Sequence, residues 1–261
     1  MSTDPLIRLD RLELTLPSQA GDVHILRGLD LAIDGGETVS VVGPSGSGKS
    51  SMMMVVGGLE RPTGGAVTVA GHDLGPMRED ALARFRRENV GIVFQDFHLV
   101  PTMTALENVA IPLEFAGRRD AFDRAAESLD KVGLGHRLSH YPGQLSGGEQ
   151  QRTALARAFA TGPKILLADE PTGNLDGETG RQVIDLLFDL CRTDGSTLML
   201  ITHDPELAAR CDRRVQLIDG HITDDGRAPA ATHKAATHKA APQQASTQQA
   251  NPGTSAARKA G

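Results

Sequence analysis

The stretch Gly43-Pro44-Ser45-Gly46-Ser47-Gly48-Lys49-Ser50 decides how the rest of the chain is interpreted, because it fits the pattern G-x-x-x-x-G-K-[ST] at every fixed position. It follows the β-branched run Thr38-Val39-Ser40-Val41-Val42 and precedes a plausible helix, which is the context of a phosphate-binding loop. Glycines let backbone N–H groups surround phosphate oxygens, and the helix directs its positive dipole end at the same anion. The alternative, a Gly- and Ser-rich turn without a ligand, is disfavoured by the complete match in this context.

This loop supplies two side chains for nucleotide chemistry. Lys49 offers a mobile positive charge to the β- and γ-phosphates, and the Ser50 hydroxyl is a ligand for Mg²⁺. The expected ligands are therefore the phosphates of a nucleotide and Mg²⁺. The residues expected to bind the nucleotide form one continuous run, namely Gly43, Pro44, Ser45, Gly46, Ser47, Gly48, Lys49, Ser50 and Ser51.

Two acidic residues end an apolar run far downstream of the loop. Asp169 and Glu170 follow Ile165-Leu166-Leu167-Ala168, and a strand of this kind carries its last residues to the edge of an open α/β sheet, where ligands bind. We expect Asp169 to hold Mg²⁺ through its water shell and Glu170 to act on a water that attacks the γ-phosphate. Taken alone, the two acids fit a solvated strand end equally well, but the phosphate loop favours the functional interpretation.

Strand-like and helix-like runs alternate along the chain. Short, nearly continuous apolar runs occupy residues 38–42, 90–94, 164–169 and 197–202, and helical patterns occupy 121–132, 147–160 and 177–190. This alternation predicts an α/β fold with a mainly parallel sheet covered on both faces. Residues 95–144 break the alternation and look mainly helical. We therefore expect a domain of residues 1–226, with a core of 1–94 and 151–226 and an inserted helical subdomain at about 95–150.

The end of the chain differs in composition from the rest. Residues 227–261 contain no Leu, Ile, Val, Phe or Met, and they carry five basic residues and no acidic one. Such a segment cannot bury enough apolar surface to offset the entropy of ordering it, so we expect a disordered low-complexity tail. His233 and His238, which lie in a short repeat, allow a metal site as the alternative to a solvated tail.

The overall composition argues against several classes of protein. The 261 residues include 33 acidic and 27 basic ones, which argues against a strongly basic nucleic-acid binder, and the two cysteines argue against a disulfide scaffold. No run approaches the ~18–20 apolar residues of a membrane span. Residues 1–10 also lack the basic and apolar pattern of a signal peptide. We therefore expect a cytoplasmic protein with no nucleic-acid partner and no direct membrane insertion.

A third motif, Leu145-Ser146-Gly147-Gly148-Glu149-Gln150-Gln151-Arg152, opens a predicted helix. Ser146 is a favourable N-cap, and Glu149 completes a capping box three residues later. A well-capped helix is the plain interpretation of this motif. Two glycines in the first turn weaken a helix, however, and they are more easily explained by the close approach of a phosphate to its N-terminus.

Together these motifs resemble those of the ATP-binding subunits of ABC transporters, over about residues 6–222. The motif that begins at Leu145 resembles the signature sequence of that family. Other landmarks follow in the family's order: Gln95 resembles the Q-loop glutamine, Gly173-Asn174-Leu175-Asp176 the D-loop, and His203 the switch histidine.

This resemblance implies a P-loop NTPase (RecA-like) core with a small antiparallel N-terminal sheet. It also implies a head-to-tail homodimer in which ATP is sandwiched between the phosphate loop of one subunit and the signature of the other. The implied catalytic residues are Lys49, Gln95, Glu170 and His203. The implied Mg²⁺ ligands are Ser50, Gln95 and Asp169. The implied contacts from the second subunit are Ser146, Gly147, Gly148 and Asp176.

Three stretches resemble one group of these ATPases more closely, the lipoprotein-releasing and macrolide-export group. They are residues 94–101, 104–109 and 168–176. Members of this group work with permeases that have few membrane spans and a large extracytoplasmic domain. The implied partner is therefore an integral membrane permease of the MacB/FtsX-like type, which would hold this chain on the inner face of the cytoplasmic membrane. A cytoplasmic helix of the permease is expected to dock near the apolar segment 95–115.

One position departs from the pattern of the family. An aromatic residue near the N-terminus usually stacks on adenine, and the spacing places Leu16 there. Phe85 is the first Phe, Trp or Tyr of the chain, so His24 is the alternative stacking group. We therefore expect weak discrimination between nucleotide bases.

Two other classes of protein share part of this pattern. A soluble P-loop kinase has a phosphate loop and an acidic strand end but no reason to carry the signature. DNA-repair ABC ATPases carry a long coiled coil between their two nucleotide motifs, whereas only about 95 residues separate Lys49 from Ser146 here. Ribosome-acting members usually hold two cassettes in one chain, and this sequence has one.

Overall fold

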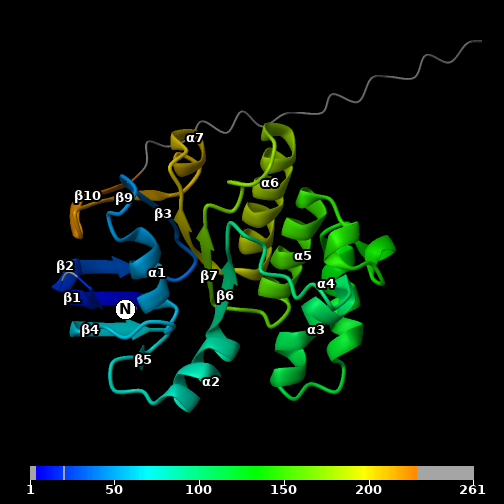
Figure 1. Cartoon of the computed structure of the whole chain (residues 1–261), viewed down its shortest axis with the longest axis horizontal. Coiled ribbons are helices and arrows are strands. Elements are labelled where there is room, and N and C mark those ends of the chain that lie inside the picture. Colours follow the sequence, from blue (N-terminus) through cyan, green and yellow to red (C-terminus); the bar gives the residue numbers. More distant parts are fainter. Residues whose placement is uncertain (1–3, 20, 228–261) are drawn as a thin grey trace, which may run out of the picture. The chain divides into compact units, whose positions relative to one another are not determined.

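Two β-sheets form the framework of residues 4–19 and 21–227, the part of the chain that the computed structural model describes (Figure 1). The larger sheet has the strand order β10-β9-β3-β8-β7-β6, and its neighbouring strands are parallel except β10 and β9. Its strands are β3 (Thr38–Val42), β6 (Val90–Val93), β7 (Ile165–Asp169), β8 (Thr197–Ile201), β9 (Arg213–Ile218) and β10 (His221–Arg227). The predicted α/β fold with a mainly parallel sheet is confirmed.

The smaller sheet is antiparallel and has the order β2-β1-β4-β5. Its strands are β1 (Ile7–Ser18), β2 (Gly21–Ile33), β4 (Gly64–Val69) and β5 (His72–Asp73). The α-helices are α1 (Lys49–Val56), α2 (Glu79–Asn89), α3 (Ala105–Phe115), α4 (Ala121–Lys131), α5 (Gly147–Phe159), α6 (Gly177–Asp194) and α7 (Pro205–Ala208). Short 3-10 turns, η1 (Gly135–Arg137) and η2 (Pro142–Gln144), precede α5.

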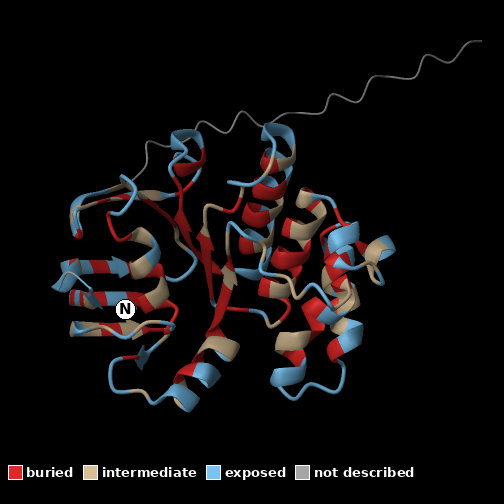
Figure 2. Cartoon of the chain, in the orientation of Figure 1, coloured by how far each residue is buried: buried red, intermediate tan, exposed pale blue. Residues whose placement is uncertain are grey.

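Alternate residues of the parallel strands enter two different hydrophobic cores, because successive side chains of a strand point to opposite faces. In β7, Ile165 and Leu167 pack with α1 and the small sheet, whereas Leu166 and Ala168 pack with α5 and α6. Figure 2 shows the buried residues continuing along β3, β7 and β6. This double coverage explains why the strands are almost wholly apolar in sequence.

The helical segment between β6 and β7 has a hydrophobic cluster of its own. Residues of α3, α4 and α5 form it. Helix α5 belongs to two clusters at once, because Leu155 packs beneath the large sheet while Ala156 packs with α3 and α4. The boundary that we expected at residue 150 therefore falls inside one continuous helix.

Most element boundaries lie within a few residues of those predicted. The helices predicted at 121–132, 147–160 and 177–190 run over 121–131, 147–159 and 177–194. Strand β10 extends to Arg227, which the sequence assigned to the tail. The rest of the expected tail, with His233 and His238, lies outside the described residues. In the described part of the chain, no helix combines the length and apolar character that a membrane crossing requires.

Leu167 provides a test of the core between the two sheets. It is fully buried in the middle of β7, so we expect Leu167→Ala to lower the free energy of unfolding by about 2–5 kcal/mol. Leu59 is 45% exposed, and Leu59→Ala should cost less than about 1 kcal/mol. Urea denaturation measures both values, and equal losses in the two variants would contradict the assignment of Leu167 to the core.

Candidate nucleotide-binding site

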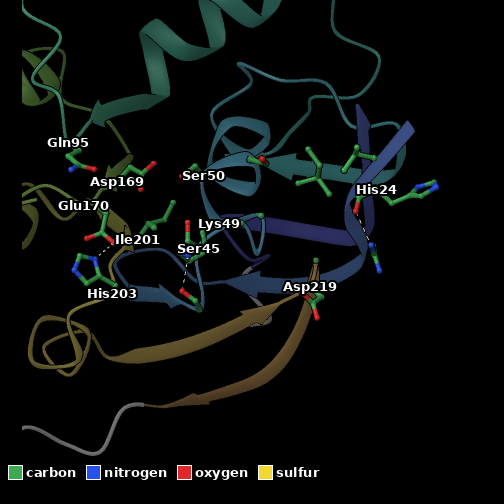
Figure 3. A pocket seen from close by; sticks show the side chains of 18 of the residues that line it. His24, Ser45, Lys49, Ser50, Gln95, Asp169, Glu170, Ile201, His203 and Asp219 are labelled. Carbon is green, nitrogen blue, oxygen red and sulfur yellow. Dashed lines mark hydrogen bonds and ion pairs between the residues drawn. The ribbon is translucent and has the colours of Figure 1, made fainter. Parts of the chain in front are cut away.

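A cavity of about 1030 Å³ opens at the edge of the large sheet where its parallel strands end (Figure 3). Segments that are far apart in the sequence line it: Val23, His24, Ile25 and Arg27 from β2; Gly43, Ser45, Gly46, Gly48, Lys49, Ser50 and Ser51 from the loop after β3 and the start of α1; Gln95 after β6; Asp169, Glu170 and Gly173 around the end of β7; Ile201 and His203 around the end of β8; and Asp219 and Gly220 between β9 and β10.

Close backbone contacts shape the loop between β3 and α1. Gly43 has a φ of 154°, and a Cβ atom at this position would lie 2.0 Å from the carbonyl oxygen of Leu217 in β9. Gly48 has a φ of 101°, and a Cβ atom there would lie 2.8 Å from Leu26 Cδ2 in β2. The positive φ angles disfavour other residues at both positions, and at Gly43 the contact with the β9 backbone also excludes a Cβ atom.

The start of α1 is suited to an anion. Its N-cap is Gly48, which makes no side-chain cap, and its first turn carries no acidic residue. The first N–H groups of a helix have no partner within the helix, and the helix dipole places partial positive charge at the same end. Because Lys49, Ser50 and Ser51 of this first turn line the cavity, phosphate oxygens fit here.

The ammonium group of Lys49 lies against its own loop. It donates hydrogen bonds to the carbonyl oxygens of Gly43, at 2.9 Å, and Pro44, at 2.8 Å. A phosphate that entered the cavity would compete with two neutral acceptors, and a charged oxygen is the stronger acceptor. The Lys49 ammonium therefore bonds its own loop in this structure, and a bound phosphate would replace these two carbonyl acceptors.

An unusual backbone conformation directs Glu170 towards His203. Glu170 follows Asp169, the last residue of β7, with a φ of 45°, which is uncommon for a residue other than glycine. Its N–H donates to the carbonyl oxygen of Ile201 at 3.0 Å, and its Oε1 lies 2.7 Å from Nδ1 of His203. The Glu170 side chain is 20% exposed and that of His203 is 78% exposed, so the histidine has room to move (Figure 3).

The fold thus brings the principal predicted side chains to one cavity: Lys49, Ser50, Gln95, Asp169, Glu170 and His203. Pro44 and Ser47 of the loop do not line it, and Ser47 is buried. Among residues 4–19 and 21–227, no group of three or more His, Cys, Asp or Glu side chains is arranged to hold a metal ion. The few oxygen donors present suit Mg²⁺, which usually combines one or two carboxylates with waters and substrate phosphates.

The start of α5 does not line this cavity. Ser146 Oγ accepts the N–H of Glu149 at 3.3 Å, and the Glu149 carboxylate accepts the N–H of Ser146 at 2.8 Å. The bond from the Ser146 N–H to the carboxylate is the main cause of a Glu149 pKa below its usual range, and the Ser146 hydroxyl and a 2.9 Å ion pair with Arg137 lower it further. A Cβ atom on Gly148 would lie 2.4 Å from Thr179 Cγ2, so packing against α6 is sufficient to explain this glycine.

Asp176 is a second predicted site residue that does not line the cavity of its own chain. Its carboxylate caps α6 and accepts the N–H groups of Glu178, at 3.2 Å, and Thr179, at 3.0 Å. The bonds to Thr179 are the main cause of its lowered pKa. Ser146, Gly147, Gly148 and Asp176 therefore stand outside the cavity of their own chain, and Gly148 is buried.

Leu16, which we expected at the nucleotide base, does not line the cavity, and its contact with the base stays a prediction. Leu16 pairs with Val23 across the β1–β2 hairpin and packs, half-buried, against the core. Val23 and His24, on the opposite strand, line the cavity instead, and His24 Nδ1 is 2.8 Å from Thr15 Oγ1. Because directly paired residues of an antiparallel hairpin point to the same face, the Leu16 and Val23 side chains lie on the same face of the hairpin.

Arg27 and Asp219 also line the cavity, and sequence reasoning missed them. They reach it through long-range contacts: Arg27 N–H donates to the Gly220 carbonyl at 2.9 Å, and Gly220 N–H donates to the Ser47 carbonyl at 3.1 Å. The Asp219-Gly220 turn was the available signal, because it marks a tight connection between strands. Nothing in its sequence indicates that it lies beside the phosphate loop.

Comparisons with known proteins agree with this geometry. Residues 26–173 match the family described as ABC transporter. The chain is 51% identical over 222 residues to the lipoprotein-releasing system ATP-binding protein LolD 2 of Caulobacter vibrioides, a match that covers 84% of this chain and 97% of that protein. It is 44% identical to the macrolide export ATP-binding/permease protein MacB of Burkholderia pseudomallei, over 88% of this chain and 35% of that protein.

A solved structure gives the same result. It is a dimeric structure of a post-hydrolysis state of the ATP-binding cassette MJ0796 bound to ADP and Pi. Its TM-score is 0.79 at 39% sequence identity, and the match covers 85% of this chain and 99% of that chain. The fold, the phosphate loop and these relatives lead to one conclusion: the chain belongs to the ABC transporter family as an ATP-hydrolysing, ATP-binding subunit of the LolD/MacB type.

Proposed function

We propose that this chain works as a head-to-tail dimer that couples ATP hydrolysis to a membrane permease with a large extracytoplasmic domain. The observation that carries the proposal is the cavity, where a helix N-terminus, a lysine and two carboxylates converge from separate segments. The domain responsible would comprise residues 1–226, with the helical subdomain at about 95–150.

The residues of the cavity fit ATP and Mg²⁺. The N–H groups at the start of α1 and the Lys49 ammonium would bind the β- and γ-phosphates. Ser50, Gln95 and Asp169 would hold Mg²⁺, which, when bound, neutralises charge on these phosphates. Lys49 would exchange its two carbonyl acceptors for phosphate oxygens.

Glu170 and His203 would have different roles at the γ-phosphate. The Glu170 carboxylate would accept a proton from the attacking water, and the backbone contact of Glu170 with Ile201 supports this role because it holds the residue at the cavity. The exposed imidazole of His203 would move from Glu170 to the γ-phosphate and stabilise the charge that develops there. In this proposal, the 2.7 Å contact between Glu170 and His203 is present before nucleotide binds and is broken afterwards.

A second copy would complete the site. The signature residues Ser146, Gly147 and Gly148 do not line the cavity of their own chain, and a relative with the same fold is dimeric. In the proposed dimer they would contact the γ-phosphate held by the other subunit, and Asp176 would connect the two sites. The capping bonds at Ser146 and Glu149 support this role, because they keep the helix N-terminus ordered.

A permease would attach at the helical segment. One relative is named as an ATP-binding/permease protein, and this chain covers only 35% of it. Phe115, at the end of α3, is 75% exposed and Phe122, at the start of α4, is 45% exposed, whereas the other apolar residues that we expected there, Phe97, Leu99, Val100, Met103 and Leu106, are half-buried. This surface would hold the chain on the inner face of the cytoplasmic membrane.

Lys49→Ala tests the phosphate site. We expect ATP binding to weaken about 10- to 100-fold, because a charge-assisted hydrogen bond contributes about 1.5–3 kcal/mol, and hydrolysis to be lost. Titration with a fluorescent ATP analogue measures the affinity. Lys164→Ala, at an exposed position that does not line the cavity, should bind like the parent chain. Unchanged affinity in Lys49→Ala would contradict the phosphate site.

Glu170→Gln tests the general base. The amide keeps the shape of the side chain but cannot take the proton, so the hydrolysis rate should fall about 10²- to 10⁴-fold while ATP still binds. The ATP-bound dimer should then accumulate, as measured by gel filtration and phosphate release. Glu114→Gln, on an exposed face of α3, is the matched control. Hydrolysis at the parent rate in Glu170→Gln would refute the assignment.

Ser146→Arg tests the composite site. The large cation should obstruct the nucleotide of the other subunit, so hydrolysis should stop while a monomer binds ATP with unchanged affinity. Equilibrium binding at low protein concentration separates these effects. The composite site is wrong if Ser146→Arg weakens ATP binding by a monomer as much as Lys49→Ala does.

A further inference from the structure

The side chain of Asn174 joins the loop after β7 to the loop after β6. Its amide group donates to the Gln95 carbonyl oxygen at 3.1 Å and to Asp96 Oδ1 at 2.8 Å. Its own oxygen accepts a longer bond, 3.4 Å, from Nε2 of Gln95. The side-chain amide of Asn174 therefore bonds two consecutive residues, Gln95 and Asp96, and both its NH₂ group and its oxygen take part.

Gly173, the preceding residue, supplies a second and independent contact with Gln95. A Cβ atom on Gly173 would lie 2.8 Å from Gln95 Nε2, 2.9 Å from its Cδ and 3.1 Å from its Cγ. The Gln95 side chain therefore lies directly on the bare backbone of Gly173, with its amide turned to Asn174. Gly173 and Asn174 therefore contact Gln95 from the same loop, and we call these two residues the Gln95 seat.

The backbone on either side of this seat is held separately by α5. Gln151 Nε2 donates to the carbonyl oxygens of Phe94, at 3.4 Å, and Pro171, at 2.7 Å. Arg157 donates to the carbonyl oxygens of Phe97, at 2.9 Å, and His98, at 2.6 Å. Because α5 already holds the backbone of both loops, the remaining effect of Asn174 falls on Gln95, whose carbonyl and side-chain amide it bonds, and on the Asp96 carboxylate.

We propose that Asn174, seated beside Gly173, is a positioning residue that holds the Gln95 amide in the catalytic cavity for ATP hydrolysis. The inference rests on the proposed role of Gln95 towards Mg²⁺ and the attacking water. Asparagine suits this position because it supplies two donors and one acceptor at once. Aspartate loses the donors and places a second negative charge beside Asp96, and alanine loses all three bonds.

Asn174→Ala in the full chain is the first test. Misplacing a catalytic group by about 1 Å costs up to about 10²-fold, so we expect kcat to fall about tenfold. ATP affinity and KM should change less than about twofold, because the phosphate loop is untouched. The Mg²⁺ concentration that gives half-maximal activity should rise. Thermal unfolding should stay within a few degrees of the parent chain, since α5 still holds both loops.

A readout without nucleotide isolates the effect on position. NMR relaxation of the Gln95 side-chain amide in the nucleotide-free chain should show restricted motion in the parent and faster motion in Asn174→Ala. Asp96→Ala is the matched control, because it removes only the 2.8 Å bond and leaves both contacts to Gln95. It should keep the Gln95 amide restricted and kcat within about twofold of the parent value.

A double-mutant cycle with Gln95→Ala decides between positioning and a separate role. Gln95→Ala should lower kcat, and adding Asn174→Ala should lower it no further, since the residue to be positioned is gone. Additive losses would overturn the inference. So would parent-like kcat and Mg²⁺ dependence in Asn174→Ala when Gln95→Ala is impaired, and this result would leave the proposed role of Gln95 intact. Full activity in Gln95→Ala would overturn that role and the inference with it.

Discussion

The parallel pairing of β3 with β8 and of β8 with β7 is the constraint on which the site depends. Parallel strands end at the same edge of a sheet, so the loop after β3, the acids after β7 and His203 after β8 face one cavity. The register places Asp169 opposite Ile201, and the next residue, Glu170, bonds to the Ile201 carbonyl. A slip of one residue would exchange the two buried faces of β7 and separate these groups.

Helix α5 is the second element that the site requires. It packs in two hydrophobic clusters, and its Gln151 and Arg157 side chains hold the loops after β6 and β7. Its N-terminus carries Ser146, which is exposed and does not line the cavity. One rigid helix therefore connects a surface available to a second subunit with two loops that reach the catalytic groups. Through this helix, contact of the second subunit with Ser146 would alter the position of the loops after β6 and β7.

Local patterns in the sequence predicted much of this architecture. The phosphate loop carries its own context of strand and helix, and the apolar runs of β7 and β8 are readable because both faces of the sheet are buried. The part of the cavity formed by β2 and the β9–β10 turn could not be predicted in this way. Val23 and His24 come to it from β2, and Asp219 arrives through contacts between distant segments.

The glycines of the signature give a further lesson about sequence motifs. We explained the pair by the approach of a phosphate, yet a Cβ atom on Gly148 would collide with Thr179 within the same chain. Packing and function can require the same residue, and only the structure exposes the packing requirement. Similarly, Asn174 carried no signal of its own in the sequence beyond its place in the D-loop, because its partners Gln95 and Asp96 lie almost 80 positions away.

The central claim is that each catalytic cavity is completed by a second copy of the chain, and mixing two inactive variants tests it directly. A chain with Lys49→Ala and a chain with Ser146→Arg are combined in equal amounts, and phosphate release is measured. In a mixed dimer, one site joins the altered phosphate loop of the Lys49→Ala chain to the altered signature of the Ser146→Arg chain. The other site joins the intact phosphate loop of the Ser146→Arg chain to the intact signature of the Lys49→Ala chain. The account predicts that activity returns, at up to about a quarter of the parent rate, since half of the dimers are mixed and each holds one intact site. A mixture as inactive as its two components would contradict it.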